Sequence, residues 1–146
     1  MKKSRLSRFW TATAGTAAIE FAFLALPFTG VATTGFEVAR ACWTLEALHE
    51  SAIQGARCMG IHASSCSASG VYNEAVTIAH VQDVARGWGV SVPSTAISAT
   101  EDASCGNVPG FAQIRISYTF SSVAGKLIPA LNNLPLTASS CYPKNT

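Results

Sequence analysis

Residues 16–36 read TAAIEFAFLALPFTGVATTGF and form the longest apolar run in the chain. At ~1.5 Å of rise per residue, a helix over this run is long enough to cross the ~30 Å hydrocarbon core of a bilayer. Glu20 is its only charged residue and Pro27 its only strong helix breaker. We therefore expect residues 16–36 to form a transmembrane helix.

A basic leader comes before this run. It holds four basic residues and no acidic one: Lys2, Lys3, Arg5 and Arg8. Because basic flanks stay on the cytoplasmic side, we expect a cytoplasmic N-terminus and an exported segment over residues 37–146. The net charge of +2 therefore divides into a basic tip and a mildly acidic body. A nucleic-acid binder would need its basic residues on a folded face, so no nucleic-acid partner is expected.

The helical pattern continues beyond the apolar run. From Glu37 to Gly60, apolar positions recur every three or four residues, as on one face of an amphipathic helix: Val38, Cys42, Leu45, Leu48, Ala52, Ala56 and Met59. The opposite, wet face is assigned to Glu37, Glu46, Glu50, Gln54 and Arg57. A cleaved secretory signal would be shorter and would end at a break in the helix, so it fits less well. One long helix, with its first half in lipid and its second half in water, is the better prediction.

A second helix is predicted over Val71–Arg86, with Gly87 and Gly89 as its stop. After Gly89 the period changes to two, most clearly over Phe111–Phe120, where apolar and polar residues alternate. Three further stretches are candidate strands: Val90–Val92, Ala96–Ala99 and Leu134–Cys141. The segment Val123–Leu134 is interpreted as a packed loop or a short helical turn. The predicted fold class is α+β, in which two helices precede a small antiparallel sheet of three or four strands.

An exported body lies in an oxidising compartment, where cysteines are expected to pair. Cys42 is interpreted as a small packing residue or a lone thiol. Four cysteines remain and allow three pairings: Cys58, Cys66, Cys105 and Cys141. We favour Cys58–Cys66 and Cys105–Cys141, and the alternative that some of them stay reduced is left open. The spacing Cys58-x3-His62-x3-Cys66 offers three ligands without a fourth, so no structural zinc is expected.

Enzyme signatures are missing from the sequence, which has neither a Gly-rich phosphate loop nor a Gly-x-Ser-x-Gly elbow. The histidines have no obvious partner set: His49, His62 and His80. The pair Glu101-Asp102 is interpreted as a solvated loop. Trp43 and Trp88 are interpreted as packing residues on core-facing sides or at helix ends, and Trp10 as an interfacial anchor. We expect no enzyme activity, no cofactor and no small-molecule substrate.

Glu20 allows two interpretations. An acidic side chain within a membrane helix is costly and is a functional candidate by default. Alternatively, it lies one turn inside the helix, where its side chain reaches the headgroups and the helix dipole favours it.

The sequence motif around Glu20 favours the functional interpretation. Behind the basic leader, Gly15-Thr16-Ala17-Ala18-Ile19-Glu20-Phe21-Ala22 is similar to the processing site of type IV-like prepilins, and most similar to TadE-like pseudopilins of the tight-adherence (Tad/Flp) pilus assembly system. Gly35-Phe36-Glu37-Val38-Ala39-Arg40, followed by Trp43 and by Gly55-Ala56-Arg57, resembles the same family. The resemblance covers residues 8–60. Two features depart from the family pattern: Thr16, Thr33 and Thr34 within the apolar run, and the five cysteines.

The resemblance implies a pilin-like layout and a maturation step. A membrane-embedded prepilin peptidase would cut between Gly15 and Thr16, and a residue without a side chain before the cut suits close approach of an enzyme. The leader, residues 1–15, would be removed. Glu20 and Phe21 would serve subunit assembly, with the Glu20 carboxylate pairing with the Thr16 amine of a neighbouring subunit. Residues 37–146 would be the exported TadE-like domain.

The implied function is that of a minor pilin or pseudopilin that helps to start, cap or regulate a pilus used for surface adhesion. Its partners would be the membrane, the prepilin peptidase, other pilins or pseudopilins and the Tad inner-membrane machinery. It would lie in the bacterial inner membrane as a single-pass protein with a periplasmic C-terminal domain, with incorporation into the pilus left open. Two alternatives remain: a pseudopilin of a type II secretion apparatus, and an uncleaved, membrane-anchored periplasmic binding domain.

Overall fold

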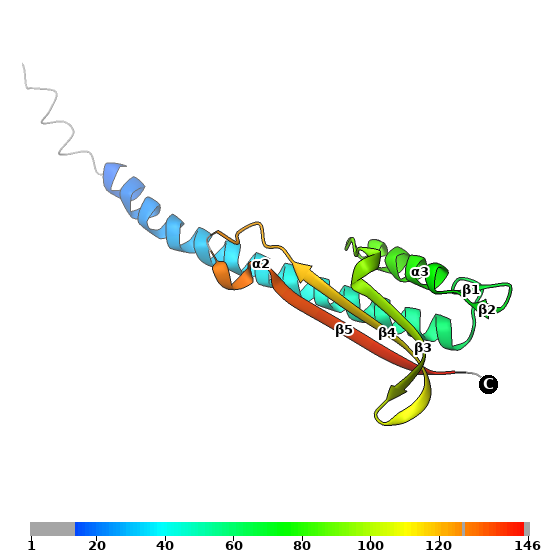
Figure 1. Ribbon diagram of the computed structural model, residues 1–146. Coiled ribbons are helices and arrows are strands. Elements are labelled where there is room, and N and C mark those ends of the chain that lie inside the picture. Colours follow the sequence, from blue (N-terminus) through cyan, green and yellow to red (C-terminus); the bar gives the residue numbers. More distant parts are fainter. Residues whose placement is uncertain (1–13, 127, 145–146) are drawn as a thin grey trace, which may run out of the picture. The chain divides into compact units, whose positions relative to one another are not determined.

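The computed structural model describes residues 14–126 and 128–144 (Figure 1). The four basic leader residues and Trp10 lie outside the described residues. The chain divides into two units, Met1–Phe36 and Glu37–Thr146. Helix α2 (Ala14–Gly60) contributes its first part to one unit and its second part to the other.

In the first unit, the described residues form a helix whose apolar side chains are uncovered. The large ones are between 59% and 75% exposed: Ile19, Phe21, Phe23, Leu24, Leu26, Phe28, Val31 and Phe36. Three threonine hydroxyls donate to carbonyls of the same helix, Thr29 to Leu26 at 2.9 Å, Thr33 to Thr29 at 2.7 Å and Thr34 to Gly30 at 2.9 Å. These bonds satisfy the polar groups within the helix, as an apolar surrounding requires. Among the described residues, α2 is the one helix long and apolar enough to cross a membrane.

The second unit confirms the α+β prediction. After α2 come the short strands β1 (Ser67–Ala68) and β2 (Val71–Tyr72), and then helix α3 (Glu74–Gly87). A 3-10 turn, η1 (Ser94–Ala96), leads into β3 (Ile97–Cys105) and β4 (Val108–Phe120), and η2 (Pro129–Leu131) precedes β5 (Leu134–Pro143). Strands β1 and β2 form an antiparallel hairpin, and β3, β4 and β5 form an antiparallel sheet in that order. Figure 1 shows the second half of α2 and α3 on the same side of this sheet.

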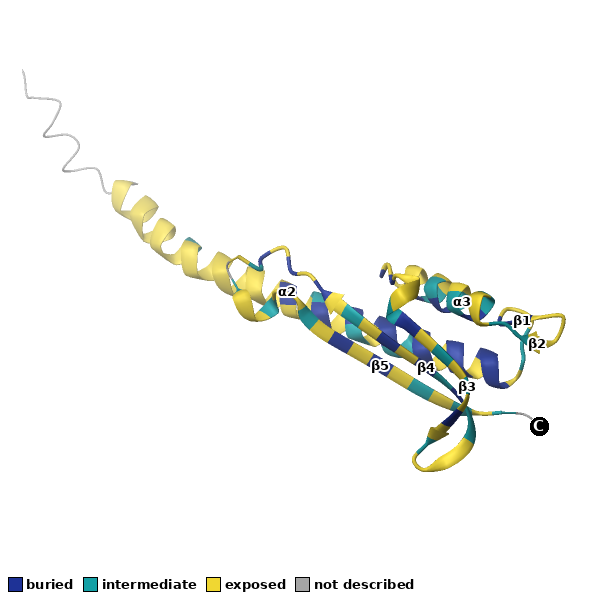
Figure 2. Cartoon of the chain, viewed as in Figure 1, coloured by how far each residue is buried: buried dark blue, intermediate teal, exposed yellow. Residues whose placement is uncertain are grey.

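The hydrophobic core lies between the two helices and the central strand β4. The alternation over 111–120 is confirmed, because Ala112, Ile114, Ile116 and Phe120 are buried while the residues between them are exposed or half-buried. They share one cluster with Leu48 and other α2 residues and with Val81 and Ala85 of α3. Figure 2 shows buried positions in dark blue on α2, α3 and β4. At Gly55, a methyl group would overlap Cγ2 of Val81 and lie 3.2 Å from Cγ1 of Ile114. Glycine therefore allows α2, α3 and β4 to meet.

The buried face of α2 differs from the predicted face at its beginning. Leu48, Ala52, Ala56 and Met59 are buried as expected, but Val38 and Cys42 are exposed. The buried face begins instead with four residues that the rest of the second unit covers: Glu37, Ala41, Thr44 and Ala47. The assignment of Glu37 to the wet face was wrong. The other wet-face residues are exposed or half-buried.

Several element boundaries also differ from the prediction. Helix α3 begins at Glu74 rather than Val71, because the Asn73 side chain caps it by accepting from the Val76 N–H at 3.1 Å. Residues 90–93 form no strand, and β3 begins at Ile97 and runs much further than expected. Glu101 and Asp102 therefore lie in β3, at a shift of register between Thr100 and Ala103, and not in a loop. The short helical turn expected in 123–134 is present as η2.

Candidate functional site

The predicted processing and assembly residues all lie in the first two turns of α2. Gly15, Thr16, Glu20 and Phe21 are exposed, and a methyl group at Gly15 would meet no atom within 4 Å. Thr16 and Glu20 are four residues apart, so they lie on the same face of the helix. The segment thus offers an uncovered backbone at Gly15, a carboxylate one turn beyond Thr16 and a large aromatic ring next to it.

Glu37 starts the helix of the second unit with a buried carboxylate that is only 1% exposed. The Ser122 hydroxyl donates to its Oε2 at 2.5 Å, and Arg40 Nη1 donates to its Oε1 at 2.7 Å. The Ser122 bond, helped by Arg40 and by the backbone of Val123, keeps the pKa of Glu37 below its ordinary value although burial opposes this. The carboxylate is therefore ionised in the folded protein and satisfied on both oxygens.

This contact fastens the loop after β4 to the first turn of the body. Ser122 Oγ also accepts from the Ala124 N–H at 3.1 Å, so one side chain holds both the helix and the loop. The Arg40 guanidinium lies over the Phe120 ring, 5.4 Å from its centroid, which adds a cation–π contact at the end of β4. No local pattern in the sequence joins Glu37 to Ser122, which lies 85 residues away.

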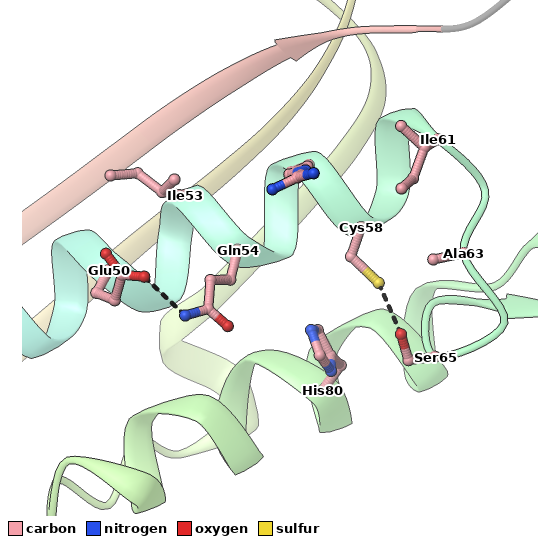
Figure 3. Close-up of a pocket in the computed structure, with 9 residues that line it drawn as sticks. Glu50, Ile53, Gln54, Cys58, Ile61, Ala63, Ser65 and His80 are labelled. Carbon is pink, nitrogen blue, oxygen red and sulfur yellow. Dashed lines mark hydrogen bonds between the residues drawn. The ribbon is translucent and has the colours of Figure 1, made fainter.

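A groove of about 380 Å³ lies between the second half of α2, the loop that follows it and α3 (Figure 3). Its lining combines charged, polar and apolar side chains: Glu50, Ile53, Gln54, Arg57, Cys58, Ile61, Ala63, Ser65 and His80. Gln54 Nε2 donates to Glu50 Oε1 at 2.7 Å along one wall. The groove is open and shallow, without a buried charged group of its own.

The disulfide Cys58–Cys66 lies at one end of this groove and links α2 to the following loop, in the pairing that the sequence favoured. Ser65 Oγ lies 3.1 Å from Cys58 Sγ, and Figure 3 shows His80 on α3 reaching toward the same sulfur. The ligand atoms of Cys58, Cys66 and His80 lie within 4.8 Å of one another. Metals bind the thiolate, so in the disulfide state His80 is the one potential ligand of this group. The sequence suggested His62 as the neighbour of these cysteines, whereas the fold brings His80 there.

The second favoured disulfide, Cys105–Cys141, joins the end of β3 to β5. Gln113 of β4 lies across it, with Nε2 3.8 Å from Cys105 Sγ and 3.5 Å from Cys141 Sγ. Cys42 is the free cysteine of the described residues and is exposed, so it is a lone thiol and not a packing residue.

A charged cluster surrounds Glu101 of β3. His62 Nε2 lies 3.9 Å from Glu101 Oε1, and Lys144 Nζ lies 4.0 Å from the same oxygen and 3.8 Å from Asp102 Oδ1. Burial, together with Glu74 and Glu101, raises the pKa of Tyr72 nearby. These partly exposed pairs join the loop after α2 to β3 and to the residue after β5, which is a structural role.

The two described tryptophans contact each other at the surface. Trp43 Nε1 donates to the Trp88 carbonyl at 3.1 Å, and their ring centroids are 5.3 Å apart. Trp88 follows the end of α3, as expected for a helix-end residue. The assignment of Trp43 to the core-facing side was wrong, because its side chain is 56% exposed.

Comparison with known proteins gives no relative: no family model, no curated protein and no solved structure matches the chain.

Proposed function

We propose that the chain is a membrane-anchored assembly subunit of a pilus, similar to the TadE-like pseudopilins of the tight-adherence system. Cleavage between Gly15 and Thr16 would release the leader, and the exposed apolar helix would then hold the mature subunit in the inner membrane. The exported body would take part in starting, capping or regulating the fibre, through contacts with other pilins and the inner-membrane machinery.

The observation that carries this proposal is the combination of motif and exposed helix. Gly15 and Glu20 lie at the start of a helix whose large apolar side chains are uncovered. Uncovered apolar surface on this scale needs lipid or neighbouring helices. A carboxylate in that surface needs a cation, and the amino group created at Thr16 of a neighbouring subunit would supply one. The α+β body that follows on the same helix agrees with a pilin-like layout.

N-terminal sequencing of the protein purified from its own membrane tests the maturation step. The expected mature N-terminus is Thr16. Gly15→Arg should leave a full-length, membrane-bound precursor, because a long charged side chain blocks approach to the peptide bond, whereas Gly15→Ala should be processed to a greater extent. Wild-type protein that retains its leader would refute processing and would favour an uncleaved anchored domain.

Substitution of Glu20 tests the assembly step. Glu20→Ala should leave membrane insertion unchanged, as measured by resistance to alkaline carbonate extraction, and should reduce piliation and surface adhesion. Glu46→Ala removes an exposed carboxylate of the body and is the matched control. Normal piliation with Glu20→Ala would contradict the role of Glu20, and loss of protein secretion instead of pili would assign the chain to a type II secretion apparatus.

A further inference from the structure

Half of the large exposed apolar residues of the body lie near the point where its helix begins. Four of them are exposed there and are named the collar: Val38, Trp43, Trp88 and Val123. Val38 follows Glu37 directly, and Val123 hydrogen-bonds to Glu37 through its backbone. Trp43 lies six residues after Glu37, about 9 Å along the helix at 1.5 Å per residue. The collar residues thus lie on or beside the first two turns of the body.

The collar is built to stay exposed. Val123 is 84% exposed although the Glu37–Ser122 bond fixes the loop that carries it. The Trp43–Trp88 contact fixes the two indoles against each other and satisfies the Trp43 N–H with a carbonyl. Two large rings and Val123 are therefore held at the surface by specific bonds, at a cost that a purely aqueous surrounding would not repay.

The arrangement fits a surrounding medium better than a single docked protein. Val38 and Trp43 are five positions apart, about 140° around a helix of 3.6 residues per turn, and Val123 adds apolar surface beside the Glu37 face. The helix over residues 38–45 carries no acidic residue, and its one charged residue, Arg40, pairs with Glu37. Tryptophans at this level are typical of a membrane–water interface.

We propose that the collar seats the body in the phospholipid headgroup layer, next to the membrane that the apolar run crosses. The inference rests on the membrane span of the proposed function. Glu37 follows the apolar run directly along the chain, so the first turns of the body are its part nearest in sequence to the span. An indole covers the helix turn before its own Cα, which brings the Trp43 ring closer to the lipid than its position in the sequence suggests.

Quenching by brominated lipid in vesicles tests this inference on the full-length chain. The chain has three tryptophans, so the pair Trp10→Phe and Trp88→Phe leaves Trp43 alone, and the pair Trp10→Phe and Trp43→Phe leaves Trp88 alone. The matched control removes all three and places the reporter Val108→Trp at the first residue of β4, where Val108 is exposed. The vesicles are phosphatidylcholine with bromine at acyl carbons 6 and 7. We expect at least twofold stronger quenching of Trp43 and Trp88 than of the control reporter.

The outcomes separate the collar from the span. Trp43 quenched no more than the control, in protein that resists carbonate extraction, would overturn the collar and leave the span standing. Protein that does not stay with the vesicles would refute both. A second copy covering the patch would give an unquenched, blue-shifted Trp43 together with Cys42–Cys42 cross-links, and this would also overturn the inference.

Discussion

The hydrogen bond between Ser122 and Glu37 attaches the loop after β4 to helix α2. The carboxylate is buried, and its strongest partner is the Ser122 hydroxyl, at 2.5 Å. A buried carboxylate that loses its donors keeps its desolvation cost without compensation. Removing the Ser122 hydroxyl or the Glu37 carboxylate should therefore destabilise the folded protein.

We expect Ser122→Ala and Glu37→Gln to lower the thermal midpoint of the detergent-solubilised protein at pH 7, as measured by circular dichroism. The effect depends on pH in a defined direction. The pKa of Glu37 in the folded state lies below its ordinary value of 4.5, so its stabilisation is complete above that value and is lost as the pH falls through the folded pKa. The difference in thermal midpoint between wild type and Glu37→Gln should therefore shrink as the pH falls below 4.5.

Glu46→Gln is the matched control, since this carboxylate is exposed on the same helix. It should leave the midpoint and its pH dependence close to wild type. A constant difference between wild type and Glu37→Gln across the acid range would contradict the ionised, hydrogen-bonded state assigned to Glu37.

Helix α2 closely approaches its neighbours at Gly55, where α3 and β4 leave no room for a methyl group. We expect Gly55→Ala to destabilise the protein by about 1–2 kcal/mol, because overpacking of about 1–3 kcal/mol exceeds the helix-propensity gain of up to about 1 kcal/mol. The measurement is the free energy of unfolding in denaturant.

Gly87→Ala is the control for this substitution, because a methyl group at Gly87 would meet nothing within 4 Å and the residue ends α3 with an ordinary backbone. It should be neutral or slightly stabilising. If Gly55→Ala were equally neutral, the helix and strand would have room to separate, and the close contact would not be required.

The two disulfides close loops of different length, with sequence separations of 8 and 36 residues. By loop-closure entropy, removing Cys58–Cys66 by paired alanine substitutions should cost about 2.5 kcal/mol, and removing Cys105–Cys141 about 4 kcal/mol. Unfolding of both variants under oxidising conditions measures this order. The reverse order would show that the bridge beside the groove contributes through native contacts, such as those with Ser65 and His80.

Elements with a regular period could be predicted from the sequence, and elements defined by distant partners could not. Strand β4 was predicted because its alternation matches a sheet with one buried face. The hairpin of β1 and β2 was missed because strands of two residues have no period. The extension of β3 was missed because the acidic residues of β3 pair with Lys144, which the local pattern does not reveal.

The candidate site divides in the same way. The motif from Gly15 to Phe21 is linear, so it can be read from the sequence without a fold. The groove and the position of His80 depend on how α3 packs against α2, and no spacing along the chain encodes that contact. Glu37 was misplaced for a related reason, since its partner comes from the loop after β4.

At the scale of the whole molecule, charge and apolar content are separated along the chain. The basic residues of the leader come first, then the apolar run, and then a body whose six basic and seven acidic side chains nearly balance. A positive flank before a single span keeps the N-terminus in the cytoplasm and sends the body across. The distribution thus predicts one orientation for the whole chain, and the free thiol of Cys42 offers a way to test it.

We expect a membrane-impermeant maleimide to label Cys42 in intact spheroplasts, because this thiol is exposed and lies in the part of α2 that follows the apolar run. In a background of Cys42→Ser with Gly15→Arg, which retains the leader, Ser4→Cys should be labelled only after lysis, since it precedes the span. Cys42→Ser alone is the control and should not be labelled. Labelling of Ser4→Cys in intact spheroplasts would show the opposite orientation. The scissile bond at Gly15 would then lie outside the cytoplasm, although a prepilin peptidase has to cut it on the cytoplasmic side.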